Sequence, residues 1–305
     1  MAFSAADVKN LREMTGVGMM DCKKALAASD GDMDKAVEYL RERGLAASAK
    51  KAGRIAAEGM AYAAVINGVG VVVEVNAETD FVGKNEKFVD FVKGVAATVA
   101  SEAPKDLDAL MACKFNGGAE TVTQQQQEMV LVIGENIKVR RFARFADGVS
   151  VPYIHAGGKI GVLVNLDVEG EVSEKVVEAG KDMAMQIAAL NPRFLDKSQV
   201  TEDVLAEERK IMLAQMDNDP KMTGKPAQVK EKIVEGKLNK FYAENCLLQQ
   251  DFVKDNTMTV EQYVAAVAKA AGVKVTLKDA VRFEKGEGIE KKQEDFAAEI
   301  ASMIK

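Results

Sequence analysis

Hydrophobic residues recur at two spacings along this 305-residue chain, and the two spacings separate expected helices from expected strands. Within residues 1–45, apolar side chains return every three or four positions in three short runs, which predicts three helices. We expect Ser4 to cap the first helix and Asp32 the third, because both side chains can accept a backbone N–H bond. Asp21 is expected to open the second helix, and Gly44 to end the third. The expected inward positions are Val8, Leu11, Met14, Cys22, Ala25, Leu26, Ala36, Val37 and Leu40.

A sheet-and-helix pattern then occurs twice. Residues 60–75 are rich in β-branched and apolar side chains on either side of Asn67-Gly68, a pair typical of a tight hairpin turn. Residues 151–166 predict a second hairpin, and Val69–Val73 aligns with Ile160–Val164. We interpret the two halves as an internal duplication in which an antiparallel sheet packs against a helix. The two helix faces carry Phe88, Phe91, Val92, Val95 and Val99 in the first half and Val176, Val177, Met183, Ile187 and Leu190 in the second.

Further segments complete an expected α+β fold. A helix at Thr121–Ile133 should expose the tract Gln124–Gln127, and a strand should follow at residues 136–145. Two charged amphipathic helices at residues 196–242 predict a projecting antiparallel coiled-coil hairpin, with Val204, Leu205, Ile211, Met212, Val229, Ile233, Leu238 and Phe241 along its apolar stripes. The predicted divisions are an N-terminal three-helix domain at 1–45, a linker at 46–58, core subdomains at 59–148 and 149–288, and a C-terminal helical module at 289–305.

Composition narrows the class of protein. The chain has 41 basic and 47 acidic residues, a net charge of -6, so we expect a protein partner and no direct contact with nucleic acid. The first eleven residues lack the apolar core of a signal peptide, and no window has the roughly 18 uncharged apolar residues of a membrane helix. Cys22, Cys113 and Cys246 lack metal or redox spacing. We therefore expect a cytoplasmic protein without a membrane contact.

Several kinds of chemical site have no counterpart in the sequence. No GxxxxGK[ST] motif occurs, so the chain has no phosphate-binding loop of its own. Asp30–Asp34 resembles the start of a calcium loop, but Arg41 stands where the loop needs a bidentate glutamate, so we interpret it as a helix cap. The only histidine, His155, is expected to be structural or exposed. The basic run Lys138–Arg144 fits a half-buried strand with a solvated face better than a phosphate contact.

The segment Thr79-Asp80-Phe81-Val82 follows a β-branched strand and is the main candidate site. Two interpretations are open from the residues alone. Asp80 could cap the following helix while Phe81 staples that helix to the core. Alternatively, Phe81 is exposed and acts as a wedge against another molecule. Met19 and Met20 raise the same question, since methionine serves both as core filler and on adaptable binding surfaces.

Six motifs along the chain match one protein family. The two most specific are LREMTGVGMMDCKKAL at Leu11–Leu26 and EVNAETDFV at Glu74–Val82. The others are IGENI at Ile133–Ile137, His155 with IGVL at Ile160–Leu163, VEG at Val234–Gly236 and RFEKGEGIE at Arg282–Glu290. They occur in order from about residue 4 onward, and together they resemble the elongation factor Ts family of bacteria. One departure is the connection Val264–Lys278, which looks longer than usual.

This resemblance implies a guanine nucleotide exchange factor for elongation factor Tu, with GDP, GTP and magnesium belonging to the partner and no cofactor of its own. It implies a ubiquitin-associated-type N-terminal domain and a hairpin that some members use for self-association. By the same resemblance, Asp80 and Phe81, flanked by Thr79 and Val82, enter beside the partner's nucleotide-binding domain. The other implied contacts are Arg12, Met19, Met20, Lys23, Ile133, Gly134, His155, Val253, Phe296 and Ile300.

Two other classes of function stay open at this point. A non-catalytic adaptor would combine the three-helix domain with the coiled coil and leave nucleotide release unchanged. An enzyme would use acids such as Glu74, Glu78 and Asp80, although no second acid–base partner accompanies them.

Overall fold

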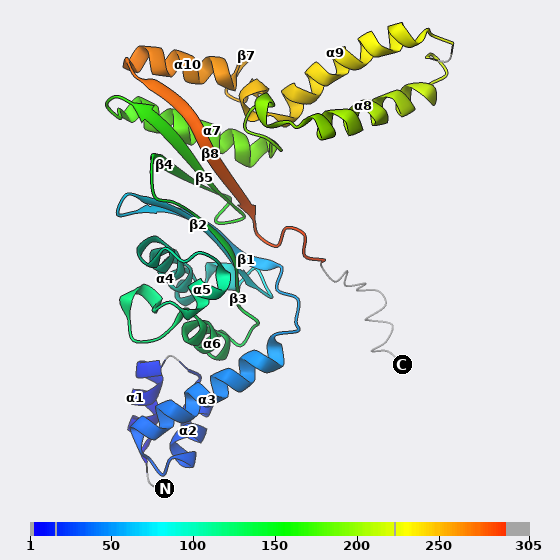
Figure 1. Cartoon of the computed structure of the whole chain (residues 1–305). Coiled ribbons are helices and arrows are strands. Elements are labelled where there is room, and N and C mark those ends of the chain that lie inside the picture. Colours follow the sequence, from blue (N-terminus) through cyan, green and yellow to red (C-terminus); the bar gives the residue numbers. More distant parts are fainter. Residues whose placement is uncertain (1–2, 16, 223, 291–305) are drawn as a thin grey trace.

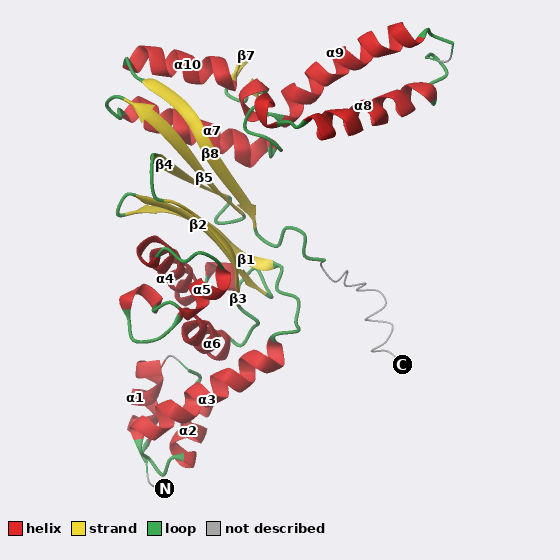
Figure 2. Ribbon diagram, viewed as in Figure 1, coloured by secondary structure: helices red, strands yellow, loops and turns green. Residues whose placement is uncertain are grey.

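Two three-stranded antiparallel sheets lie face to face at the centre of the molecule, and helices cover the outer face of each (Figure 1). The structure, a computed structural model, describes residues 3–15, 17–222 and 224–290. Figure 2 shows helices at both ends of the molecule and strands between them. The fold is therefore α+β, as predicted.

The N-terminal helices are α1 (Ala5–Thr15), α2 (Met19–Ala28) and α3 (Met33–Lys51). Ser4 and Asp32 accept backbone N–H bonds at the starts of α1 and α3, as predicted. Two boundary predictions were wrong. The second helix begins at Met19, before Asp21, and α3 continues through Gly44. Gly44 is buried within α3 and faces α6, where an added Cβ would lie 3.5 Å from the Gln127 carbonyl oxygen, an ordinary contact distance.

Most expected inward positions of these helices are buried, but Met14 is 65% exposed and Val37 is half-buried.

The first half of the core wraps one apolar cluster. Its elements are β1 (Glu58–Ile66), β2 (Val69–Ala77), η1 (Val82–Lys84), α4 (Glu86–Glu102), α5 (Leu107–Ala112), η2 (Phe115–Gly117), α6 (Val122–Ile133) and β3 (Lys138–Phe145). All five predicted apolar positions of α4 are buried against the sheet. The expected exposed tract was largely wrong, because only Gln124 of the four glutamines is exposed. The Gln126 side chain instead accepts the Val139 N–H at 2.9 Å, at the start of β3.

The second half repeats the arrangement. Its elements are β4 (Val149–His155), β5 (Ile160–Glu169), α7 (Glu174–Leu190), η3 (Lys197–Gln199), η4 (Leu247–Gln249), β6 (Asp251–Phe252), β7 (Asp255–Thr259), α10 (Val260–Ala271) and β8 (Lys274–Glu284). The strand orders are β1-β2-β3 and β4-β5-β8, each with the second hairpin strand in the centre, which is what a duplication predicts. Val177 and Leu190 were wrongly placed inward and are 40% and 48% exposed. The connection Val264–Lys278 consists of α10 and the start of β8.

Equivalent glycines of the two central strands let the sheets approach closely. Gly70 of β2 and Gly161 of β5 occupy the same position in the aligned segments. A Cβ on Gly70 would lie 2.3 Å from Ser150 Oγ on β4, and a Cβ on Gly161 would lie 3.1 Å from the Ala61 carbonyl carbon on β1. The apolar contacts between the sheets are made by Ala61, Ala63, Val72, Leu163 and Phe283.

Replacing Gly70 with alanine should lower the free energy of unfolding by about 1–3 kcal/mol, the usual cost of forcing extra volume into a packed core. Gly236 in the next helix pair is the matched control, because nothing lies within 4 Å of an added Cβ there. Gly236→Ala should raise the free energy of unfolding by roughly 0.5–1 kcal/mol. Urea unfolding measures both values. A Gly70→Ala variant as stable as the wild type would contradict the close contact between the sheets.

The helices α8 (Glu202–Asp217) and α9 (Ala227–Asn245) pack against each other and extend away from the sheets (Figure 1). Leu205, Met216, Val234, Leu238 and Phe241 are buried between them and their base. Ile211 and Val229, which were placed on the apolar stripes, are instead 42% and 41% exposed.

The predicted C-terminal module, with Phe296 and Ile300, lies outside the described residues apart from its first two residues. The domain divisions stay predictions.

Candidate functional site

Phe81 is exposed on a turn that is otherwise well anchored. The turn follows β2, and 80% of the Phe81 side chain is accessible to solvent, the highest fraction among the large apolar residues of the described chain. Asp80 is also exposed. The next residue, Val82, is 5% exposed and packs into the core beneath the sheet. A single buried residue therefore holds the turn from below while the two residues before it face solvent.

The helix-cap interpretation of this segment was wrong. Asn85 caps α4, and its side-chain oxygen accepts the N–H groups of Lys87 and Phe88 at 3.0 and 3.4 Å. Asp80 lies before the short helix η1, and Phe81 does not reach the core. The exposed-wedge interpretation agrees with these positions.

Carboxylates on two neighbouring segments hold the turn from the side. Glu135 accepts the Thr79 N–H at 2.9 Å and the Thr79 hydroxyl at 2.6 Å. Glu78 accepts the Asn136 N–H at 2.6 Å and pairs with Arg54 at 3.5 Å. The sequence reasoning missed these contacts, although the IGENI motif contains Glu135 and Asn136.

Ile133 and Gly134 lie beside the same turn. Ile133 is the last residue of α6 and packs at the edge of the first core. Gly134 ends the helix with a φ of 86°, a left-handed conformation that glycine adopts without strain. The Lys51 ammonium donates to the Gly134 carbonyl, so the end of α3 is fastened to the loop that carries Glu135. The structure thus brings two predicted contact residues next to Thr79.

His155 lies near the start of β1, as does the turn that carries Phe81. It is exposed at the end of β4, and its Nδ1 lies 3.1 Å from the Tyr153 hydroxyl. The following turn contacts β1, because the Ala61 N–H donates to the Gly158 carbonyl at 2.8 Å. The η1 turn contacts β1 two residues earlier, where a Cβ on Gly83 would lie 2.9 Å from the Gly59 carbonyl oxygen. The start of β1 therefore carries both turns.

The remaining predicted contacts are separate from this turn. Met19 and Met20 are 53% and 64% exposed, so the core-filler interpretation was wrong. Arg12 and Lys23 are also exposed on these N-terminal helices, which lie at one end of the molecule (Figure 1).

Val253 is 48% exposed in the turn between β6 and β7, on the far side of the second sheet. Its N–H donates to Gln186 of α7 at 2.9 Å. The neighbouring Lys254 pairs with Asp182 at 2.6 Å, which also fastens this turn to α7.

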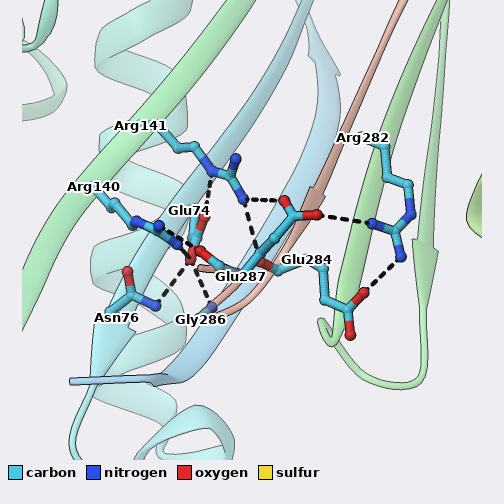
Figure 3. A network of polar contacts seen from close by, with 8 residues as sticks. All are labelled: Glu74, Asn76, Arg140, Arg141, Arg282, Glu284, Gly286 and Glu287. Carbon is cyan, nitrogen blue, oxygen red and sulfur yellow. Dashed lines mark hydrogen bonds and ion pairs between the residues drawn. The ribbon is translucent and has the colours of Figure 1, made fainter. Parts of the chain in front are cut away.

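Glu74 is the centre of a buried polar network that joins the two sheets (Figure 3). Its carboxylate accepts bonds from Arg140 and Arg141 of β3 and from the Gly286 N–H, which follows β8. The Arg141 guanidinium also lies over the Phe283 ring, 4.3 Å from its centroid. The bonds from Gly286, Arg140 and the other donors outweigh the effect of burial and lower the pKa of Glu74 below its ordinary value of 4.5.

The network corrects two expectations about charged residues. The basic strand β3 is half-buried, as expected, and Lys138 is exposed, but its arginines are engaged within the chain, because Arg140 and Arg141 pair with Glu74 and Arg144 donates to the carbonyls of Val99 and Ala100. Glu74 is fully buried, and its carboxylate accepts four hydrogen bonds, from Asn76, Arg140, Arg141 and the Gly286 N–H, so it serves as the centre of this network. Among the described residues, no group of three or more His, Cys, Asp or Glu side chains is arranged to hold a metal ion. Across the same residues, every helix is too short or too polar to span a membrane.

Comparison with known proteins gives the family. The sequence model of the family "Elongation factor TS" matches residues 78–287, beginning at the exposed turn. An elongation factor Ts of Trichlorobacter lovleyi is 52% identical over 310 residues, covering 99% of this chain and 98% of the relative. The chain belongs to the elongation factor Ts family. Elongation factor Ts proteins of Syntrophotalea carbinolica and Clostridium novyi are each 47% identical, over 100% and 97% of this chain.

Membership of the elongation factor Ts family makes this chain a translation elongation factor, with a role in protein biosynthesis. The relatives cover the N-terminal helices as well as the core, whereas the family match begins at Glu78.

Proposed function

We propose that this chain is the guanine nucleotide exchange factor of elongation factor Tu. The observation that carries the proposal is Phe81, an aromatic side chain 80% exposed on a turn whose neighbours are fixed. The wedge is rigid because Val82 is buried on one side and Thr79 is bonded to Glu135 on the other. A rigid tip displaces the backbone of its target, while a mobile tip would itself be displaced.

In this proposal the chain binds elongation factor Tu with GDP and inserts Asp80 and Phe81 beside the nucleotide and magnesium site. GDP, GTP and magnesium belong to the partner, and the chain supplies no catalytic group or cofactor. Binding energy suffices, because a protein that weakens GDP binding by some factor is itself weakened by GDP to the same degree. When GTP binds, the same linkage releases the exchange factor.

Other surfaces would supply the affinity. Ile133, Gly134 and His155 lie around the same end of β1 and would contact the nucleotide-binding domain near the wedge. Met19 and Met20, with Arg12 and Lys23, form an exposed set of side chains on α1 and α2 suited to a second contact. These four residues have the adaptable, amphipathic chemistry that a protein interface uses.

At the other end of the molecule, Val253 would contact a more distal domain of elongation factor Tu, and Phe296 and Ile300 would add a C-terminal contact. The α8–α9 pair would act as the family's coiled-coil hairpin and support self-association. As a translation factor the chain would work in the cytoplasm, without direct contacts to nucleic acid or membrane.

Stopped-flow release of fluorescent GDP from elongation factor Tu tests the proposal. We expect the chain to accelerate release in a concentration-dependent, saturable manner, because differential binding of the nucleotide-free partner lowers the barrier. Intrinsic release without the chain is the baseline. An adaptor would bind elongation factor Tu and leave the release rate at this baseline, and that result would refute the proposal.

A further inference from the structure

The pairing between β2 and β3 continues beyond its last backbone pair through side chains. The last paired residues are Asn76 and Lys138. Extending the same antiparallel register places Glu78 opposite Asn136 and Thr79 opposite Glu135. At these two positions a carboxylate of one segment accepts the backbone N–H of the other, with Glu78 bonded to Asn136 and Glu135 bonded to Thr79. Each segment therefore both donates and accepts one backbone N–H bond.

Of the two carboxylates, Glu135 makes two bonds to the residue opposite it, whereas Glu78 makes one. The two oxygens of Glu135 bind one residue, because Oε2 accepts the Thr79 N–H at 2.9 Å and Oε1 accepts the Thr79 hydroxyl at 2.6 Å. Bonds to an ionised acceptor are shorter and roughly twice as strong as bonds between neutral groups. Thr79 is the residue before Asp80, and Val82 is buried just after Phe81. The two exposed residues thus lie between two fixed points.

The segment that carries Glu135 is itself anchored. Lys51 donates to the Gly134 carbonyl, and the Asn136 side chain donates to the Arg54 carbonyl at 2.7 Å. Asn136 is 7% exposed, and Ile137 beside it is buried in the first core. Glu135 therefore projects from a fixed platform toward Thr79, which is the arrangement needed to hold a turn in one position.

We propose that Glu135 is a positioning residue for nucleotide exchange, which holds the Thr79 backbone and hydroxyl so that Phe81 meets the partner in one orientation. This inference rests on the proposed function. Glu135 acts only through Thr79, since its bonds go to neither Asp80 nor Phe81. The two bonds from Thr79 to Glu135 form a clamp on the turn. Without this clamp the turn samples several positions, and ordering it costs free energy at the moment when the partner's nucleotide site is displaced. The maximum rate falls as a result, while contacts elsewhere keep the affinity.

The first measurement uses the free protein and needs no partner. The chain contains no tryptophan, so Phe81→Trp introduces a single tryptophan at the tip of the turn, whose fluorescence can be excited selectively. In that background we expect Glu135→Ala to lower the fluorescence anisotropy of the reporter, because the turn gains local motion. Glu135→Gln keeps one acceptor and should lie between Glu135→Ala and the parent. Glu86→Ala is the matched control, since Glu86 is an exposed acid at the start of α4 and bonds to no residue of the turn within the described chain.

The second measurement follows GDP release from elongation factor Tu, with Phe81 intact. We expect Glu135→Ala to lower the maximum rate roughly tenfold, as for the loss of a charge-assisted hydrogen bond, and to change the half-saturating concentration by less than about twofold. Glu135→Gln should recover part of the rate, and Glu86→Ala should match the wild type. Melting temperatures of all variants should agree closely.

The outcomes separate the clamp from the function it serves. If the wild-type chain does not accelerate release, the proposed function fails, and the positioning role fails with it. If the wild type accelerates release while Glu135→Ala shows an unchanged rate and anisotropy, the clamp is overturned and the exchange function stands. A rise in the half-saturating concentration or a loss of melting temperature, with the maximum rate retained, would assign Glu135 a structural role and also overturn the proposal.

Discussion

Replacing Phe81 with alanine is expected to lower the maximum acceleration of GDP release by between about tenfold and about a hundredfold. Burying a phenylalanine side chain contributes about 1.5–3 kcal/mol, and each 1.4 kcal/mol corresponds to a factor of ten. Because 80% of the side chain is exposed in the chain alone, that contribution is available only in the complex. The melting temperature of the variant should therefore equal that of the wild type. Stopped-flow release and thermal unfolding measure the two quantities.

Val65→Ala is the matched control for this prediction. Val65 is also an exposed apolar residue, with 42% of its surface accessible, and lies near the opposite end of β1 from the Gly59 contact. Its truncation should leave exchange unchanged. If Val65→Ala slowed release as much as Phe81→Ala, the effect would reflect general loss of apolar surface and the wedge assignment would be wrong.

Replacing Glu74 with alanine should cause the largest loss of stability among these variants, about 3–5 kcal/mol, the usual cost of breaking a buried ion pair. Glu74 is fully buried, and its removal leaves Arg140 and Arg141 without their shared carboxylate. It also removes the acceptor of the Gly286 N–H, so the segment after β8 loses one of its bonds to the first sheet. Urea unfolding at neutral pH gives the value.

Glu287→Ala is the control for Glu74. The Glu287 side chain is 44% exposed and also pairs with Arg141, but exposed pairs contribute at most about 1 kcal/mol. Its truncation should therefore change stability little. A loss equal to that of Glu74→Ala would show that the exposed Glu287–Arg141 pair stabilises the fold as much as the buried carboxylate does, and would contradict this prediction.

Lowering the pH should remove the contribution of the Glu74 carboxylate to the free energy of unfolding. The folded-state pKa lies below the ordinary value of 4.5, so the ionised carboxylate stabilises the fold at pH values above 4.5. As the pH falls through the folded-state pKa, the carboxylate is protonated and this stabilisation is lost. The difference in unfolding free energy between the wild type and Glu74→Gln should shrink in acid. A difference that stays constant from pH 7 into this acidic range would contradict the role of the charge.

Local patterns predicted the repeated hairpins because their signals lie within a few residues. Asn67 and Gly68 both have positive φ, 51° and 82°, so the turn chemistry alone specified that hairpin. Gly44 shows the limit of such signals. A glycine at that spacing usually ends a helix, but here α3 continues through Gly44 and packs against α6, a contact that no local pattern contains.

The site residues show the same limit over longer distances. Asp80 and Asn85 can both cap a helix, and the intervening η1 turn decides in favour of Asn85. The two arginine partners of Glu74 lie 66 and 67 residues away in the sequence, and the partner of Thr79 lies 56 residues away. These contacts could have been inferred from strand register only after β2 and β3 were recognised as neighbouring strands.

The central claim is that Phe81 favours the nucleotide-free form of elongation factor Tu over its GDP form. Calorimetric titration of the chain into both forms measures this preference directly. We predict that the wild-type chain binds the nucleotide-free form roughly a hundredfold more tightly, within the usual range of coupling between sites. Phe81→Ala should reduce the ratio by at least about tenfold. Equal affinities of the wild-type chain for the two forms would contradict the account.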